Sequence, residues 1–210
     1  MYLPPHFRED RPEVQLGLIA AHPLGLLVSH GEDGLLADPL PFLHEPEPAP
    51  SGRLRAHMAR ANPHWRRLAG EGCDVLVVFQ GPQAYVTPSW YAAKREHGKV
   101  VPTWNYLTVQ VRGRAVVTDA TDWLAGQTAA LTDRMEAGRD EPWAVTDAPE
   151  PFVASQLKAI VGLEIRIERI VGKWKASQNR APADRAGVRE GLAQAGAEAA
   201  AMAEAMRERS

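Results

Sequence analysis

Aromatic residues that lie beside hydrogen-bonding groups are the part of this sequence with the clearest chemical meaning. Four of the six tryptophans fall in such segments, which span residues 57–65, 81–91, 102–106 and 172–180. A planar heterocycle can pack on a tryptophan or tyrosine ring, its polar edge can meet Asn, Gln or Ser, and a phosphate requires Arg, Lys or backbone amides. The segments contain all these groups and therefore predict a site for a planar phosphorylated ligand. The alternative is that each ring is a core or interface residue whose polar atoms have found partners.

Patterns for other chemistry are weak or missing. The sequence has no Gly-x-Gly-x-x-Gly, no P-loop and no Gly-x-Ser-x-Gly motif. Ser155 and Lys158 match Ser-x-x-Lys, but this spacing is common on a solvated helix face. The seven histidines form neither His-x-x-x-His nor His-Glu-x-x-His, so no bound metal is expected. Cys73 is the single cysteine, which excludes an intramolecular disulfide and favours a reducing compartment.

Six or seven strands are predicted to position the aromatic segments. Residues 25–30 and 35–43 read as a β-hairpin, because the turn between them has a glycine at each end. Further strands are expected at 53–58 and 74–79, and alternating apolar residues predict two more around 107–112 and 163–168. The proline-rich segment 45–52 is expected to be a loop.

Helices are expected at the ends of the chain and in one long insertion. They are expected at residues 12–23, where Pro23 ends the helix, and at 62–69, 121–135 and 149–160, with Asn62 and Thr121 as caps. One alanine-rich helix with a thin apolar face is expected at 183–209. The interpretation is a mainly β fold with flanking helices (α+β), with a barrel favoured over a βαβ array. We expect one domain at 1–181, with a helical insertion at about 119–160, followed by a C-terminal helical arm at 182–210.

Charge and hydropathy limit the partners. The chain has 210 residues, and its 24 Lys and Arg against 26 Asp and Glu give a formal net charge of −2. A DNA-binding domain draws much of its affinity from neutralised phosphates, so DNA binding would require basic residues gathered on one face. No run of about 18 apolar residues and no leader pattern occurs, so we expect a cytoplasmic protein without membrane contact.

Five segments in order, 1–4, 57–65, 79–91, 101–106 and 172–179, resemble the FMN-binding negative transcriptional regulator (PaiB-like) family over almost the whole chain. The resemblance implies the FMN-binding split β-barrel shared with pyridoxamine-phosphate oxidases and flavin reductases. It also implies a homodimer with FMN at the subunit interface. The chain departs from the family at Val86 and Thr87, where Ile and Ser are frequent, and at Ala176, where Leu is usual. Both departures are mild changes of packing.

The resemblance also implies a set of cofactor-binding residues. The phosphate is expected at His57, Arg60 and Asn62. The flavin ring or the dimer interface is expected at Ser89, Trp90, Tyr91, Thr103, Trp104, Asn105 and Tyr106. The last strand is expected to contribute Lys173, Trp174, Ser177 and Gln178.

Three functions follow as hypotheses. The first is a flavin-binding negative transcriptional regulator, acting on DNA directly or through a protein partner. The second is an FMN-dependent oxidoreductase or flavin reductase, in which His57 could donate a proton. The third is a structural dimer with a vestigial flavin site, in which the alanine-rich tail clasps the two subunits.

Overall fold

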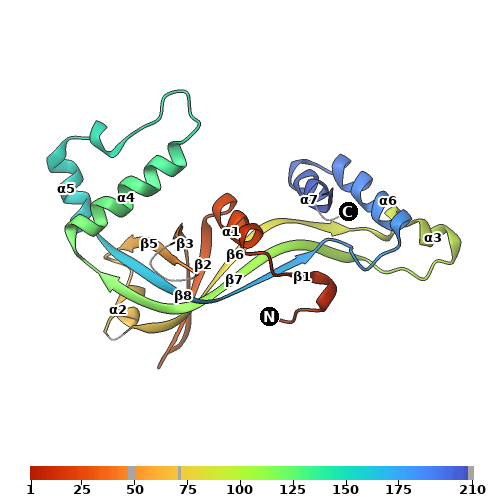
Figure 1. Ribbon diagram of the computed structural model, residues 1–210, viewed down its shortest axis with the longest axis horizontal. Coiled ribbons are helices and arrows are strands. Elements are labelled where there is room, and N and C mark those ends of the chain that lie inside the picture. Colours follow the sequence, from red (N-terminus) through yellow and green to blue (C-terminus); the bar gives the residue numbers. More distant parts are fainter. Residues whose placement is uncertain (47–50, 71, 208–210) are drawn as a thin grey trace. The chain divides into compact units, whose positions relative to one another are not determined.

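The computed structural model describes residues 1–46, 51–70 and 72–207, whose helices and strands are labelled in Figure 1. Eight strands form one sheet in the order β3-β2-β6-β7-β8-β5-β4, with β1 (Arg8–Glu9) paired to β8. The chain divides into two compact units. The first comprises Met1–Ala21, Gln80–Val109 and the described part of Val171–Ser210, and the second comprises His22–Phe79 and Gln110–Ile170. Strands β6 (Cys73–Val86), β7 (Thr103–Thr118) and β8 (Ile160–Lys175) contribute residues to both.

The expected hairpin is present in the second unit. Strands β2 (Leu24–Gly31) and β3 (Gly34–Pro41) pair antiparallel around a two-residue turn, and Gly34, directly after the turn, has a positive φ of 91° that is favourable for glycine. Strand β2 also pairs antiparallel with β6. On the other side of the sheet, β5 (Arg53–Ala59) pairs antiparallel with β4 (Leu43–Glu45) and β8. Part of the predicted loop at 45–52, residues 47–50, lies outside the described residues.

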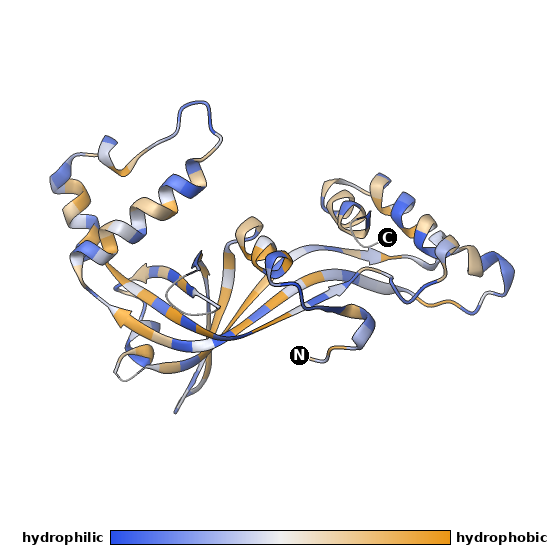
Figure 2. Cartoon of the chain, in the orientation of Figure 1, coloured by the Kyte–Doolittle hydropathy of each residue, from blue (hydrophilic) through white to orange (hydrophobic). Residues whose placement is uncertain are grey.

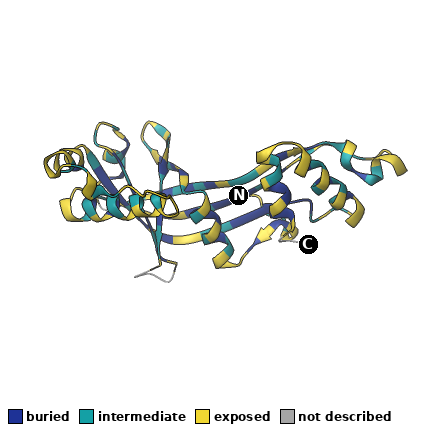
Figure 3. Ribbon diagram, turned by 90° about the horizontal axis from the view of Figure 1, so that it is seen from above, coloured by how far each residue is buried: buried dark blue, intermediate teal, exposed yellow. Residues whose placement is uncertain are grey.

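Alternating side chains of these strands form the core of the second unit. Fully buried members include Leu27, Leu54, Val77, Val111 and Ile165. Figure 2 shows the strands as mainly hydrophobic runs broken by hydrophilic residues, and Figure 3 shows buried residues gathered on strands. The strands predicted from alternation are therefore confirmed, and β6, β7 and β8 are longer than the pattern indicated.

The expected helices are present with shifted ends. They are α1 (Pro12–Ala21), α2 (His64–Leu68), α4 (Thr121–Glu136) and α5 (Glu150–Lys158), and the first unit adds α3 (Ala92–Glu96). Single-turn 3-10 helices occur at Pro5–Phe7, Pro88–Trp90 and Val145–Asp147. Thr121 was expected to cap α4, but it is the first residue of the helix, and Ala120 occupies the cap position. Helix α4 buries Leu124 and Gln127 rather than a face that extends to Met135, which is exposed.

The prediction of a single alanine-rich helix at the C-terminus is wrong. The segment forms two helices, α6 (Pro182–Gln194) and α7 (Ala197–Arg207), which pack on each other. The break falls at Gly196, whose φ of 105° lies outside the helical region and is favourable for glycine. Val188, Leu192 and Met202 are fully buried, so the apolar face is not thin. Among the described residues, no helix is both long and apolar enough to cross a membrane.

Candidate functional site

The structure divides the predicted site residues between the two units. His57, Arg60 and Asn62 belong to the second unit, and the other predicted residues belong to the first.

The first unit contains a cluster of three cations, Lys173, Lys175 and Arg180, which we call the cation cluster. Lys173 and Lys175 are two residues apart on β8, so both side chains leave the same face of the strand. Their Nζ atoms lie 5.3 Å and 5.9 Å from the centre of the Tyr106 ring on β7, within the range of cation–π attraction. Lys173 also lies over the Tyr2 ring, at 5.5 Å, and donates a hydrogen bond to the Tyr2 carbonyl.

The charges of Lys173 and Arg180 both act on Lys175. Burial lowers the pKa of Lys175, and the nearby charges of Lys173 and Arg180 lower it further. Among the described residues, no member of the cation cluster forms an ion pair with Asp or Glu. Lys175 donates hydrogen bonds to the Thr103 hydroxyl and the Trp104 carbonyl. An anionic ligand would offset this repulsion, so the cluster is a candidate anion site.

Exposed aromatic rings lie in the same unit. The side chain of Trp104 is 48% exposed, and its ring meets that of Tyr85, which is 49% exposed, in a T-shaped arrangement with centroids 6.0 Å apart. The Trp104 Nε1 donates a hydrogen bond of 3.0 Å to Gln83 Oε1. Large exposed rings that are held in place by neighbours can pack against a planar ligand.

The turn after β8 uses several predicted residues as structural supports. Asn105 is buried and donates a hydrogen bond of 2.9 Å to the Ser177 hydroxyl. Gln178 accepts a hydrogen bond of 2.8 Å from the Ala176 N–H and donates one to the Trp174 carbonyl. Ser177 has a φ of 62°, an unusual conformation for a residue other than glycine that often occurs at functional sites. These contacts fix the turn that leads from Lys175 to Arg180.

The predicted residues at 89–91 have different surroundings. Trp90 packs against α6, where a Cβ added at Gly191 would lie 2.3 Å from its ring. The Ser89 hydroxyl accepts a hydrogen bond of 3.0 Å from Lys94. Tyr91 is buried, its ring lies 4.8 Å from the Arg180 guanidinium, and its hydroxyl has no hydrogen-bond partner among the described residues. Burial and the nearby charge of Asp184 raise the pKa of Tyr91, against the lowering effect of Arg180, so the hydroxyl stays protonated.

In the second unit, Arg60 and Asn62 are occupied by contacts with the backbone. The Arg60 side chain donates hydrogen bonds to the carbonyls of Lys158 (2.9 Å) and Ile160 (3.0 Å), so it caps the C-terminal end of α5. Asn62 Oδ1 accepts a hydrogen bond of 2.9 Å from the His64 N–H, just before α2. His57 has a buried Nδ1 without a hydrogen-bond partner among the described residues, and burial lowers its pKa, which favours the neutral ring.

A Ser-His-Asp relay in the second unit escaped the sequence analysis. His64 Nδ1 lies 2.7 Å from Asp38 Oδ2, and His64 Nε2 lies 2.8 Å from Ser29 Oγ. Because a carboxylate only accepts, Nδ1 carries the proton and Nε2 accepts from the serine. His64 and Ser29 are 0% and 2% exposed, and neither of the two described cavities is lined by a residue of the relay. The relay therefore attaches α2 to the hairpin and presents no accessible nucleophile.

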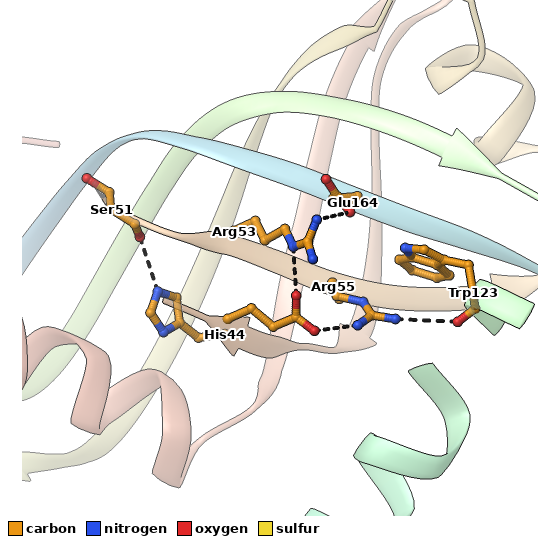
Figure 4. A network of polar contacts seen from close by, with 7 residues as sticks. His44, Ser51, Arg53, Arg55, Trp123 and Glu164 are labelled. Carbon is orange, nitrogen blue, oxygen red and sulfur yellow. Dashed lines mark hydrogen bonds and ion pairs between the residues drawn. The ribbon is translucent and has the colours of Figure 1, made fainter. Parts of the chain in front are cut away.

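A second polar network, shown in Figure 4, also escaped the sequence analysis. Glu45 accepts hydrogen bonds from Arg53 and Arg55, and Arg53 also donates one of 2.9 Å to Glu164. The Arg55 guanidinium lies 4.3 Å from the Trp123 ring centre, which joins α4 to the sheet. Burial acts to raise the pKa of Glu45, but the hydrogen bonds and charges of Arg55 and Arg53 lower it overall.

The chain matches one family and resembles several curated proteins. Residues 1–169 match the family described as "Putative FMN-binding domain". The chain is 35% identical over 193 residues to the protease synthase and sporulation protein PAI 2 of Bacillus subtilis. The match covers 91% of this chain and 89% of the relative. The cation cluster follows the part that the family matches and lies in the last part of the first unit.

Solved structures share the fold. An FAD- and haem-binding protein from Mycobacterium smegmatis has a TM-score of 0.59 at 22% identity and covers 80% of this chain and 73% of its own. The flavocytochrome Anf3 from Azotobacter vinelandii has a TM-score of 0.57 at 16% identity and covers 80% and 69%. The prediction of a mainly antiparallel split-barrel fold with flanking helices is confirmed.

Proposed function

Because the chain belongs to the family of FMN-binding domains, we propose that the cation cluster and the rings around it form part of its FMN site. The cofactor expected from the sequence, FMN, is confirmed by the family. When bound, FMN supplies a ring that accepts and gives up electrons. The observation that carries the proposal is the group of three cations without a carboxylate partner among the described residues.

The residues in the first unit fit the chemical groups of FMN. The phosphate is an anion, and Lys173, Lys175 and Arg180 supply positive charge close together. Trp104 and Tyr106 offer ring faces to the planar part. Lys175 and Arg180 extend the set predicted from the sequence, which contained only Lys173 of the three.

Retention of flavin tests this site. We expect the purified protein to keep about one FMN per chain after incubation with FMN and desalting, measured from the flavin absorption and an independent protein concentration. Lys173→Gln and Lys175→Gln should each weaken FMN binding by about tenfold or more, because each removes a charged contact. Lys99→Gln is the matched control, since Lys99 is exposed in the same unit. Equal FMN affinity in all four proteins would refute the assignment.

We infer that the chain acts as an FMN-binding negative transcriptional regulator and works as a homodimer with FMN at the subunit interface. The resemblance to the regulator family supports this role, and the name of the Bacillus subtilis relative is protease synthase and sporulation protein PAI 2. The net charge of −2 favours action through a protein partner over direct DNA binding. Expression of target genes should rise on deletion of the gene and fall again on complementation with the wild type, but not with Lys175→Gln.

The alternative role, an FMN-dependent oxidoreductase, uses the same site. It predicts that the flavin-loaded protein oxidises NADH or NADPH with turnover, monitored at the nicotinamide absorption. No oxidation with either donor would remove this alternative and leave the regulatory role.

A further inference from the structure

A cavity of about 500 Å³ lies in the second unit and is lined in part by the two helices of the insertion, α4 and α5. Its lining comes from α4, α5 and the chain beside them and comprises Arg60, Asp119, Thr121, Leu124, Glu150, Val153, Ala154, Leu157 and Lys158. This volume is within the range of small-molecule sites, which are mostly apolar with a few polar groups. None of the first-unit residues proposed for FMN lines it, whereas Arg60, which the family resemblance places at the FMN phosphate, does.

One face of α5 gives the cavity its chemical pattern. Glu150, Val153, Ala154, Leu157 and Lys158 follow the spacing i, i+3, i+4, i+7 and i+8, which places them along one side of the helix. The middle of this face is apolar, and its ends carry opposite charges. With a rise of 1.5 Å per residue, the two charged positions are separated by about 12 Å along the axis.

The charges around the cavity lack ion-pair partners. Within the part of the chain that the structure describes, Glu150, Lys158 and Asp119 form no salt bridge. Arg60 is held at the basic end of α5 by its hydrogen bonds to the carbonyls of Lys158 and Ile160, so its positive charge adds to that of Lys158. Two cations and two carboxylates make the rim neutral as a whole, as a ligand with one charge of each sign requires.

We propose that this cavity binds a short apolar peptide with free termini. An extended chain spans at most about 3.3–3.6 Å per residue, so a tripeptide is about as long as the distance between the charged ends. Its ammonium group meets Glu150, its carboxylate meets Arg60 and Lys158, and its side chains pack on Leu124, Val153 and Leu157. A free α-amino acid fits less well, because both of its charges are on one carbon atom.

Calorimetric titration with Ala-Leu-Ala tests the proposal. The blocked peptide acetyl-Ala-Leu-Ala-amide is the control, because it keeps the apolar parts and lacks both charges. We expect the free peptide to bind at least about tenfold more tightly than the blocked one, the ratio that corresponds to losing one charged contact. Glu150→Gln and Lys158→Gln should each weaken binding of the free peptide and leave binding of the blocked peptide unchanged.

A pair of tryptophan substitutions locates the site. Ala154→Trp places a large ring in the cavity and should abolish peptide binding, whereas Ser155→Trp, at an exposed neighbour outside the lining, should leave it unchanged. FMN retention should stay at the wild-type level in both variants, which separates this proposal from the flavin site. No binding of Ala-Leu-Ala, equal binding of the blocked peptide, or unchanged binding by a folded Ala154→Trp variant would overturn it.

Discussion

Replacing His64 by leucine tests whether the Ser29–His64–Asp38 relay stabilises the second unit. The substitution leaves the buried Ser29 hydroxyl without its partner, which costs about 1–3 kcal/mol. The loss at Asp38 is smaller, because its side chain is 28% exposed and water can replace the imidazole. We therefore expect His64→Leu to lower the free energy of unfolding by about 2–4 kcal/mol, measured by urea titration.

A double-mutant cycle separates the hydrogen bond from packing effects. Ser29→Ala alone leaves the buried His64 Nε2 unpaired and should cost about 1–3 kcal/mol. In Ser29→Ala/His64→Leu neither partner is left unpaired, so the double variant should be more stable than the sum of single effects predicts by about 1–2 kcal/mol. His30→Leu is the control, because His30 is exposed and follows Ser29 on β2. It should change the free energy of unfolding by less than about 0.5 kcal/mol. Additive single effects would refute the relay as a stabilising unit.

Three further predictions concern other parts of the chain. Because the pKa of Glu45 is lowered, its carboxylate contributes fully to stability above the ordinary pKa of 4.5, and this contribution is lost as the pH falls through the lowered pKa. Glu45→Gln should therefore flatten the acid limb of a plot of unfolding free energy against pH. A steep acid limb unchanged by Glu45→Gln would contradict this. Gly196→Ala should destabilise the protein by about 1–2 kcal/mol, because Gly196 has a positive φ. Gly126→Ala in α4, where nothing lies within 4 Å of an added Cβ, should stabilise the protein by about 0.5–1 kcal/mol. Both changes are measured by thermal unfolding. Arg60→Ala should lower the free energy of unfolding by about 1–2 kcal/mol. Arg60→Lys should recover little of this loss, because a lysine lacks the planar guanidinium that bonds both carbonyls. Full recovery in urea titrations would show that charge alone matters.

Local patterns in the sequence determined most of the secondary structure. Alternation at Leu163, Ile165 and Ile167 predicted a strand with one buried face, and the glycines at 31 and 34 predicted the hairpin turn. These signals are local, because the side-chain period and the turn conformation depend on a few adjacent residues. Local patterns failed at Gly196, because the high helix propensity of the alanine-rich segment predicted one continuous helix where the chain breaks into two.

The candidate flavin site was predicted in part. Residue types marked the aromatic segments, and the family resemblance implied Lys173. Lys175 was not among the expected site residues, although a residue two positions further along a strand leaves the same face. Arg180 could not be assigned, because its position depends on the turn that Ser177 and Gln178 form after the strand.

Only the tertiary structure decided which polar groups meet. His64 lies 35 residues from Ser29 and 26 from Asp38 in the sequence, and Arg60 lies 98 residues from the carbonyl of Lys158 that it caps. Periodicity tells which face of an element is buried, but it does not tell which element covers that face. The sequence could therefore identify Arg60 as a functional candidate, while its contact with the end of α5 follows from the pairing of β5 with β8, which brings these distant segments together.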